Sequence, residues 1–188
     1  MKTLSLWFNA VGLAVVLSAP SRAAEPAPAS AAPSRVGVYD SRAVAYAHFW
    51  SADEQRSRNA VIAEGRAAKA AGQTAVFEEK SRLMTDYQKR MHEEVFSDAP
   101  AVEAMAALAG RMPALLGALG VDRLVSKWDE KALQSVPEKS RVDVTEKLVR
   151  EFITPDEKQR KVLDAMKTTK PVPRGKLNHA NLHSAPVA

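Results

Sequence analysis

The chain contains no cysteine, and only 6% of its 188 residues are aromatic. Without cysteine it can form neither disulfides nor thiolate metal sites, and a lipid-modified amino-terminal cysteine is excluded. Neither a glycine-rich phosphate loop nor a nucleophile elbow occurs in the sequence. Because no disulfide can hold the fold together, helix packing or oligomerisation must do so.

The residues that are present have the composition of an ordinary soluble protein of about one domain, with 46% apolar and 26% charged residues. The net charge is +5, and it falls to +3 if Lys2 and Arg22 are removed with a signal peptide. So small a charge gives no general case for nucleic-acid binding.

The amino terminus has the pattern of a secretory signal peptide. An apolar run over residues 4–17 is followed by Ser21-Arg22-Ala23, which offers a Ser-x-Ala cleavage site. We therefore predict a cleaved signal over residues 1–23 and a periplasmic or secreted protein. The alternative is an uncleaved membrane anchor, but the apolar run falls short of the roughly 20 residues that span a bilayer.

Residues 24–34 consist of Ala, Pro, Ser and one Glu, which favours a flexible linker. The ordered domain is predicted over residues 35–167. It begins with the short β-prone run Val36–Tyr39, after which Asp40 or Ser41 can cap a helix by accepting a backbone N–H bond.

Three helices are predicted next, over residues 42 to about 50, 52–71 and 75–96. The first carries aromatic residues that are typical of a core. The second has good helix propensity but few large apolar residues to bury. Gly72-Gln73-Thr74 joins the second to the third with a C-terminal glycine and an N-cap candidate, which predicts the tip of a helical hairpin.

Apolar residues at intervals of three and four predict a further packing helix over residues 102–119, the strongest periodicity in the chain. We expect Asp98 to cap it, Pro100 to lie in its first turn, and Gly110 and Pro113 to break it near residues 110–112. Gly120 should end it.

Residues 123–125 form a second strand candidate, predicted to pair with Val36–Tyr39. We expect a helix over residues 144–153 next, capped by Asp143. A last helix should run to about Lys167 and begin with the capping box Thr154-Pro155-Asp156-Glu157. Residues 168–188 are predicted to be a disordered basic tail. The predicted fold is thus mainly α: a helical hairpin forming a coiled-coil-like arm, a two-strand β element at its base, and C-terminal helices.

The order of these parts resembles that of the periplasmic chaperone family called Skp or OmpH. The resemblance rests on Val36-Gly37-Val38-Tyr39-Asp40, the hairpin, Gly120 to Lys127, and Asp143-Val144-Thr145. It implies a trimer in which strands form a central body and helical arms surround a cavity for unfolded outer-membrane proteins, with no enzymatic activity and no cofactor. The arms are shorter here, Gly110 and Pro113 interrupt the returning helix, and C-terminal helices with a basic tail are added.

Two segments, Gly-Val-Tyr-Asp-Ser-Arg at residues 37–42 and Val-Ser-Lys-Trp-Asp at residues 125–129, are also similar to a set of exported bacterial proteins with no assigned role.

The sequence offers few candidates for catalysis or metal binding. His92-Glu93-Glu94 resembles the start of a zinc-protease motif, but Phe96 stands where its second histidine is required. His48 lacks an orienting partner in the sequence and is more typical of a packed histidine. His179 and His183 are spaced to meet on a helical face, without a third ligand nearby. We therefore predict no catalytic, cofactor-binding or metal-binding residues.

Binding surfaces are predicted on two elements. On the third helix, Phe77, Met84, Tyr87 and Met91 form an apolar stripe that can serve as a client surface or as core. Towards the carboxyl terminus, seven basic residues can contact an anionic surface or merely solvate the helix and tail: Lys158, Arg160, Lys161, Lys167, Lys170, Arg174 and Lys176.

The hypothesis that accounts for these features is an exported, non-enzymatic, Skp-like holdase or adaptor for unfolded or envelope proteins, without specific nucleic-acid binding. The alternative is an envelope structural or tethering protein that uses the basic tail on anionic surfaces. An enzyme is the third and least supported reading.

Overall fold

The computed structural model describes residues 34–177, so the predicted signal peptide and the linker up to residue 33 lie outside the described residues. Three short strands form a wholly parallel sheet with β1 in its centre and the order β2-β1-β3. They are β1 (Val36–Tyr39), β2 (Arg123–Ser126) and β3 (Arg141–Asp143). Val36 is paired with Arg123 on one side and with Arg141 on the other.

The prediction of a two-strand element is therefore correct for the pairing of β1 with β2 but wrong in the number of strands. β3 was missed because it has only three residues, with the charged Arg141 and Asp143 on either side of Val142. Asp143 does accept a hydrogen bond from Thr145 N, as a cap would, but it belongs to the strand, and α7 (Thr145–Arg150) begins two residues later.

Helix α1 (Ser41–Phe49) is the centre of the core, and all of its residues are buried. Asp40 caps it by accepting a hydrogen bond from Arg42 N, as predicted. It packs against α3, α4, α7 and α8, and its Val44 and Phe49 are among the largest fully buried side chains. The prediction that the aromatics of this segment form core is confirmed for Tyr46 and Phe49.

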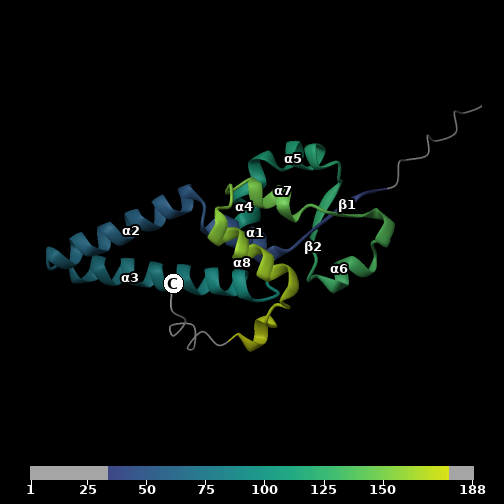
Figure 1. Ribbon diagram of the computed structural model, residues 1–188. Helices are drawn as coiled ribbons and strands as arrows, with labels where there is room; N and C mark the ends of the chain where they lie inside the picture. Colours follow the sequence, from purple (N-terminus) through teal and green to yellow (C-terminus); the bar gives the residue numbers. More distant parts are fainter. Residues whose placement is uncertain (1–33, 178–188) are drawn as a thin grey trace, which may run out of the picture. The chain divides into compact units, whose positions relative to one another are not determined.

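The predicted helical hairpin is confirmed: α2 (Ala52–Ala70) and α3 (Thr74–Phe96) run side by side in opposite directions and project from the sheet domain (Figure 1). Gly72 makes the turn at their tip with a φ of 69°, a left-handed conformation that favours glycine. The two helices approach closely at Gly65, where an added Cβ would lie 3.3 Å from the Cβ of Lys80.

The predicted break in the next helical segment is also present. It consists of α4 (Val102–Leu108), a 3₁₀ turn (Ala109–Arg111) and α5 (Met112–Leu119), and Gly120 ends it at φ 66°. Asp98 does not cap α4, because Ala101 precedes that helix and the Asp98 carboxylate accepts a hydrogen bond from Arg174 N instead. By length and composition alone Val102–Leu119 could cross a membrane, but Leu108, Leu115 and Leu119 pack into the core.

The remaining helices are α6 (Glu130–Gln134), which lies between β2 and β3, a 3₁₀ turn (Glu138–Ser140), and α8 (Glu157–Thr168). The capping box of α8 is formed by Asp156 and Gln159, two residues later than predicted. Pro155 consequently precedes the cap and does not occupy the first helical position.

Residues 169–177 differ from the predicted disordered tail. Val172 forms a parallel bridge with Ser97 at the end of α3, and a 3₁₀ turn (Arg174–Lys176) follows. Glu93 forms an ion pair with Arg174. The tail composition is polar, but backbone and ionic contacts with the end of α3 order this part of it, whereas residues 178–188 lie outside the described residues.

Candidate functional site

The carboxyl ends of β1 and β2 bring together the polar residues that follow each strand. Asp40 follows β1 and is only 3% exposed. Its Oδ1 accepts hydrogen bonds from Arg42 Nε at 3.3 Å and from Trp128 Nε1 at 2.9 Å. Its Oδ2 lies 3.2 Å from an Arg42 guanidinium nitrogen and 2.8 Å from Lys127 Nζ. Two cations and an indole N–H thus converge on one buried carboxylate.

The same groups are stacked as well as paired. The Arg42 guanidinium lies 4.9 Å from the centre of the Trp128 ring, and Lys127 Nζ lies 4.6 Å from it. Cation–π contacts of this kind add to the ion pairs and hold the indole in place. Segments 37–42 and 125–129, which the sequence analysis singled out separately, therefore meet at one point of the fold.

The cluster also anchors the carboxyl-terminal helix. One Arg42 guanidinium nitrogen donates to the carbonyl oxygens of Met166 at 2.6 Å and Thr169 at 2.8 Å, at the end of α8. A guanidinium next to a helix carboxyl terminus satisfies carbonyls that have no partner within the helix. Arg42 thereby links β1, α1 and α8 in one buried network.

Asp40 is held in its ionised form. Burial on its own would raise the pKa of Asp40, but hydrogen bonds from Arg42, Lys127 and Trp128, together with the Arg42 charge, hold it below its usual value. A carboxylate that is saturated with donors and kept ionised is a poor proton donor. The cluster is thus suited to positioning the strand ends and Trp128, not to acid–base chemistry.

A cleft of ≈ 590 Å³ lies along β2 beside this cluster. All of β2 lines it, together with Tyr39, Trp128, Pro100 in the α3–α4 connection and Ala132 on α6. β2 is an edge strand of the described sheet, paired only with β1. Because Lys127 N donates to Tyr39 O, in phase with the register of β1 and β2, the alternation of a strand directs the amides of Leu124 and Ser126 towards the open edge. The cleft therefore has unpaired backbone groups along one wall and aromatic residues at its end.

Two titratable groups lie close to this cleft. Burial raises the pKa of Tyr39, and the charges of Glu94 and Asp129 raise it further. Burial also raises the pKa of Glu94 to about 7. Glu94 Oε1 accepts a weak bond from Glu103 N at 3.4 Å, while its Oε2 has no hydrogen-bond partner among the described residues. Glu94 is consequently a buried carboxyl group without a neutralising cation.

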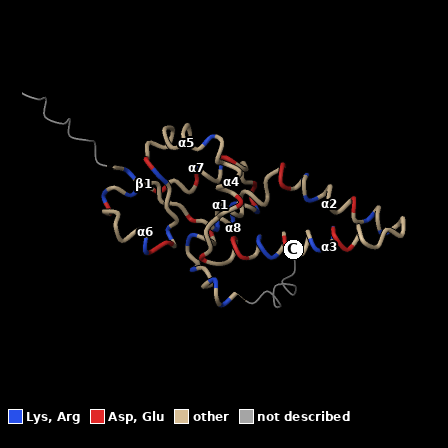
Figure 2. The backbone as a smooth tube through the Cα atoms, turned by 180° about the vertical axis from the view of Figure 1, so that it is seen from behind, with Lys and Arg blue, Asp and Glu red and all other residues tan. Residues whose placement is uncertain are grey.

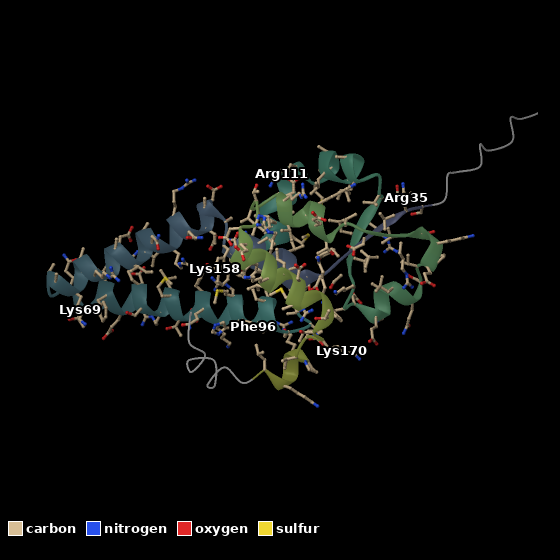
Figure 3. All side chains as sticks on the ribbon, in the orientation of Figure 1. Arg35, Lys69, Phe96, Arg111, Lys158 and Lys170 are labelled. Carbon is tan, nitrogen blue, oxygen red and sulfur yellow. The ribbon has the colours of Figure 1, made fainter. Side chains whose placement is uncertain are left out.

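The predicted client-binding residues lie half-buried along α3. Tyr87 packs edge-on against Phe49, with ring centres 5.4 Å apart, and Met91 also packs on the core. Lys69 Nζ of α2 lies 5.3 Å from the centre of the Phe77 ring, so this ring contacts a residue of the other arm, and Met84 is half-buried too. The exposed large apolar residues of α3 are instead Val76, Leu83 and Phe96, the last of which is labelled in Figure 3.

The predicted basic residues are all exposed, but they are not equally available. Ion pairs join Lys161 to Glu157, Lys167 to Asp164 and Arg174 to Glu93. Arg160 donates to Pro155 O at 2.8 Å. Lys158, Lys170 and Lys176 have no ion pair within residues 34–177, and the first two are labelled in Figure 3.

The histidines do not form a site in the part of the chain that is described. His48 is buried, as the sequence indicated, with ring contacts to Phe49 and Phe152. Burial lowers the pKa of His48, although the charges of Glu54 and Glu103 oppose this. No group of three metal-ligating side chains occurs within residues 34–177. His179 and His183 lie outside that range.

Sequence reasoning missed the convergence of Asp40, Arg42, Lys127 and Trp128. Asp40 was predicted only as a helix cap, and the others were not predicted to interact. The available signal was that two strand candidates, expected to pair, are each followed directly by charged or aromatic residues. In a parallel pair the carboxyl ends lie together, and so do the residues that follow them.

No protein-family model, no curated protein and no solved structure matches this chain.

Proposed function

We propose that this protein is an exported, non-enzymatic binding protein, a holdase or adaptor that binds extended segments of unfolded or envelope proteins. The observation that carries the proposal is the open edge of β2, which lines a cleft of ≈ 590 Å³. An extended peptide can add to such an edge through backbone hydrogen bonds, a mode of recognition known as β-augmentation.

Backbone pairing suits a protein with many clients. The amides of Leu124 and Ser126 would pair with main-chain groups that all extended peptides share, so the pairing itself demands little of the client sequence. Selectivity would come from the end of the cleft, where Tyr39 and Trp128 can contact an apolar client side chain. β2 has only four residues, and short edges are also a way to avoid aggregation, so the segment bound would be short.

The hairpin supplies a second surface. Only Gly65 and Ala68 of α2 are buried, and basic and acidic residues are interspersed along both arms (Figure 2). Leu83 and Val76 of α3 are 46% and 39% exposed. A projecting arm with scattered apolar residues can hold a client weakly while the charged residues keep the arm soluble.

The Skp-like trimer remains a separate prediction. β1 is already paired on both sides, so further strands could join only at the edges β2 and β3. Light scattering on the mature protein tests it. A trimer supports a central body made of several chains, whereas a monomer at all concentrations contradicts that assembly and leaves client capture to the single chain.

The function is tested by diluting a urea-unfolded outer-membrane protein into buffer and following its aggregation by light scattering. The wild-type protein should suppress aggregation. Ala132→Trp, which fills the cleft from α6, should raise the concentration needed for half-maximal suppression by about tenfold, equivalent to 1.4 kcal/mol. Lys131→Trp, on the exposed neighbouring residue of the same helix, is the matched control and should behave as wild type.

A second variant tests the same edge in case Ala132→Trp does not fold. Leu124→Pro removes an amide directed to the open edge and leaves the bonds to β1 in place, so it should weaken suppression if it folds as the wild type does by circular dichroism. A wild-type protein that does not slow aggregation contradicts the proposal, as do two folded variants that suppress as well as the wild type.

Unpaired lysines give some support to the alternative, an envelope tether. Lys158, Lys170 and Lys176 are exposed without ion pairs in the described region and could contact anionic polymer or lipid. Binding to anionic vesicles that is lost on changing these three residues to Gln, together with no effect on aggregation, would favour the tether.

A further inference from the structure

A second cleft, of ≈ 510 Å³, lies where α2 leaves the sheet domain and the connection between α7 and α8 passes beside it. It is separate from the edge of β2, and the two clefts share no lining residue. Its volume is within the range of about 300–1,000 Å³ found for small-molecule sites. Its wall combines aromatic rings with side-chain amides.

The aromatic part is held rigidly. The Trp50 ring is stacked on the Tyr46 ring, with centres 4.6 Å apart and planes inclined by 19°. Phe152 is held edge-on by the buried His48 ring at 5.3 Å. Since Tyr46 covers one face of the indole and Trp50 lines the cleft, a flat apolar surface is presented to a ligand without any need for rearrangement.

The amide side chains have capacity left for a ligand. Gln55 Nε2 donates to Trp50 O at 2.9 Å, which orients the side chain and leaves its Oε1 as an acceptor. Gln159 Oε1 accepts from Asp156 N at 2.9 Å, which leaves the Nε2 protons as donors. The Asn59 side chain has no hydrogen bond within residues 34–177 and offers both a donor and an acceptor.

The charge of the cleft is nearly balanced. Arg56, its one charged lining residue, forms an ion pair with Asp53 one turn earlier on α2. Uncharged amides and a neutralised guanidinium do not attract an anion strongly. They favour a neutral ligand that can both donate and accept hydrogen bonds while presenting an apolar face.

We infer that this cleft binds an N-acetylated saccharide. The N–H of an acetamido group can donate a hydrogen bond to Gln55 Oε1, and its carbonyl oxygen can accept one from the side-chain amide of Asn59 or Gln159. Its methyl group fits against Ile153 and Phe152. The apolar face of the pyranose ring packs on the exposed face of Trp50, as aromatic side chains with one free face allow. This site is independent of the proposed binding of extended peptides at β2.

The ligand is tested with two disaccharides that share the same β-1,4-linked skeleton: diacetylchitobiose, which has two acetamido groups, and cellobiose, which has hydroxyls in their place. Titration calorimetry or NMR on the mature chain, residues 24–188, measures both. Diacetylchitobiose should bind at least about tenfold more tightly, because an amide site without its acetamido partner leaves polar groups unpaired. Equal affinities, or no binding of diacetylchitobiose, would overturn the assignment.

The position is tested with variants on the surface of α2. Asn59→Ala should weaken diacetylchitobiose binding by about three- to tenfold, and Ala52→Trp should block the cleft. Ser57→Ala, exposed on the same helix but outside the cleft, is the matched control. Binding that survives both Asn59→Ala and Ala52→Trp in folded protein places the saccharide elsewhere and overturns the proposal. Ala132→Trp should leave this binding unchanged, so the failure of one proposal does not imply the failure of the other.

Discussion

Helices α1 and α2 are consecutive in the chain and opposite in character. All residues of α1 are buried, whereas α2, twice as long, buries only Gly65 and Ala68. Burial of apolar surface is the main favourable term in folding, so α1 contributes to stability and α2 contributes chiefly surface. We therefore expect that removing a few buried side-chain atoms from the sheet domain lowers the free energy of unfolding, whereas substitutions in the hairpin change it little.

The largest difference between the two regions is expected from truncating a large side chain in each. Phe49→Ala removes a ring that is 1% exposed and should lower the free energy of unfolding by about 3–5 kcal/mol. Leu83→Ala, 46% exposed on α3, should change it by less than about 0.5 kcal/mol. Urea unfolding of both variants measures this, and similar losses would show that the hairpin is part of the core.

Breaking the Asp40 network should have the next largest effect. Arg42→Ala leaves Asp40 buried without its strongest partner and the end of α8 without a donor, and should cost about 3 kcal/mol. Because the folded-state pKa of Asp40 is lowered, its contribution is present above pH 4 and is lost as the pH falls through the folded-state value. Comparing urea unfolding at pH 7 and pH 3 should therefore show a smaller loss at pH 3, and an equal loss would contradict this account.

Adding one methyl group to a glycine in each region sharpens the comparison. At Gly37 an added Cβ would lie 2.8 Å from a Leu124 methyl carbon and 3.1 Å from one of Val144, so Gly37→Ala should destabilise by about 1–3 kcal/mol. At Gly65 the gain in helix propensity opposes a single tight contact with Lys80, so Gly65→Ala should stay within about 1 kcal/mol of wild type. Thermal unfolding compares them, and a more harmful Gly65→Ala would reverse the order of the two regions.

The smallest expected effect concerns Glu94, where the hairpin joins the domain. Its folded-state pKa of about 7 exceeds the usual value of 4.5 for a Glu, so the folded protein loses stability as the pH rises between these values and no further above pH 7. Glu94→Gln should stabilise the protein at pH 8 by about 1–2 kcal/mol, allowing for solvent screening, and should change little at pH 4. Equal effects at both pH values would show that Glu94 does not titrate in this way.

Much of the helical structure could be predicted because its signals are local. Gly72 and Gly120 mark the ends of α2 and α5, Pro113 and Gly110 mark the interruption between α4 and α5, and Asp40 caps α1. Each of these depends on residues within one or two turns, and the sequence displays them directly.

The candidate sites could not be predicted in the same way. Tyr87 and Met91 were on the correct face of α3, but the sequence could not tell whether that face meets a client or Phe49. The basic residues were identified correctly, yet ion pairs such as that between Glu93 and Arg174 depend on a chain reversal that brings residues 81 positions apart into contact.

The sequence by itself determined where the helices lie, where the hairpin turns and which two segments form the principal strand pair, since propensity, capping and apolar spacing act over short distances. Only the tertiary structure decided that a third strand of three residues joins the sheet, that Asp40 meets Lys127 and Trp128, and that Gln55 and Gln159 face the same cleft. These contacts join residues far apart in the chain, and they form because a buried charge requires partners and a parallel sheet aligns its strand ends.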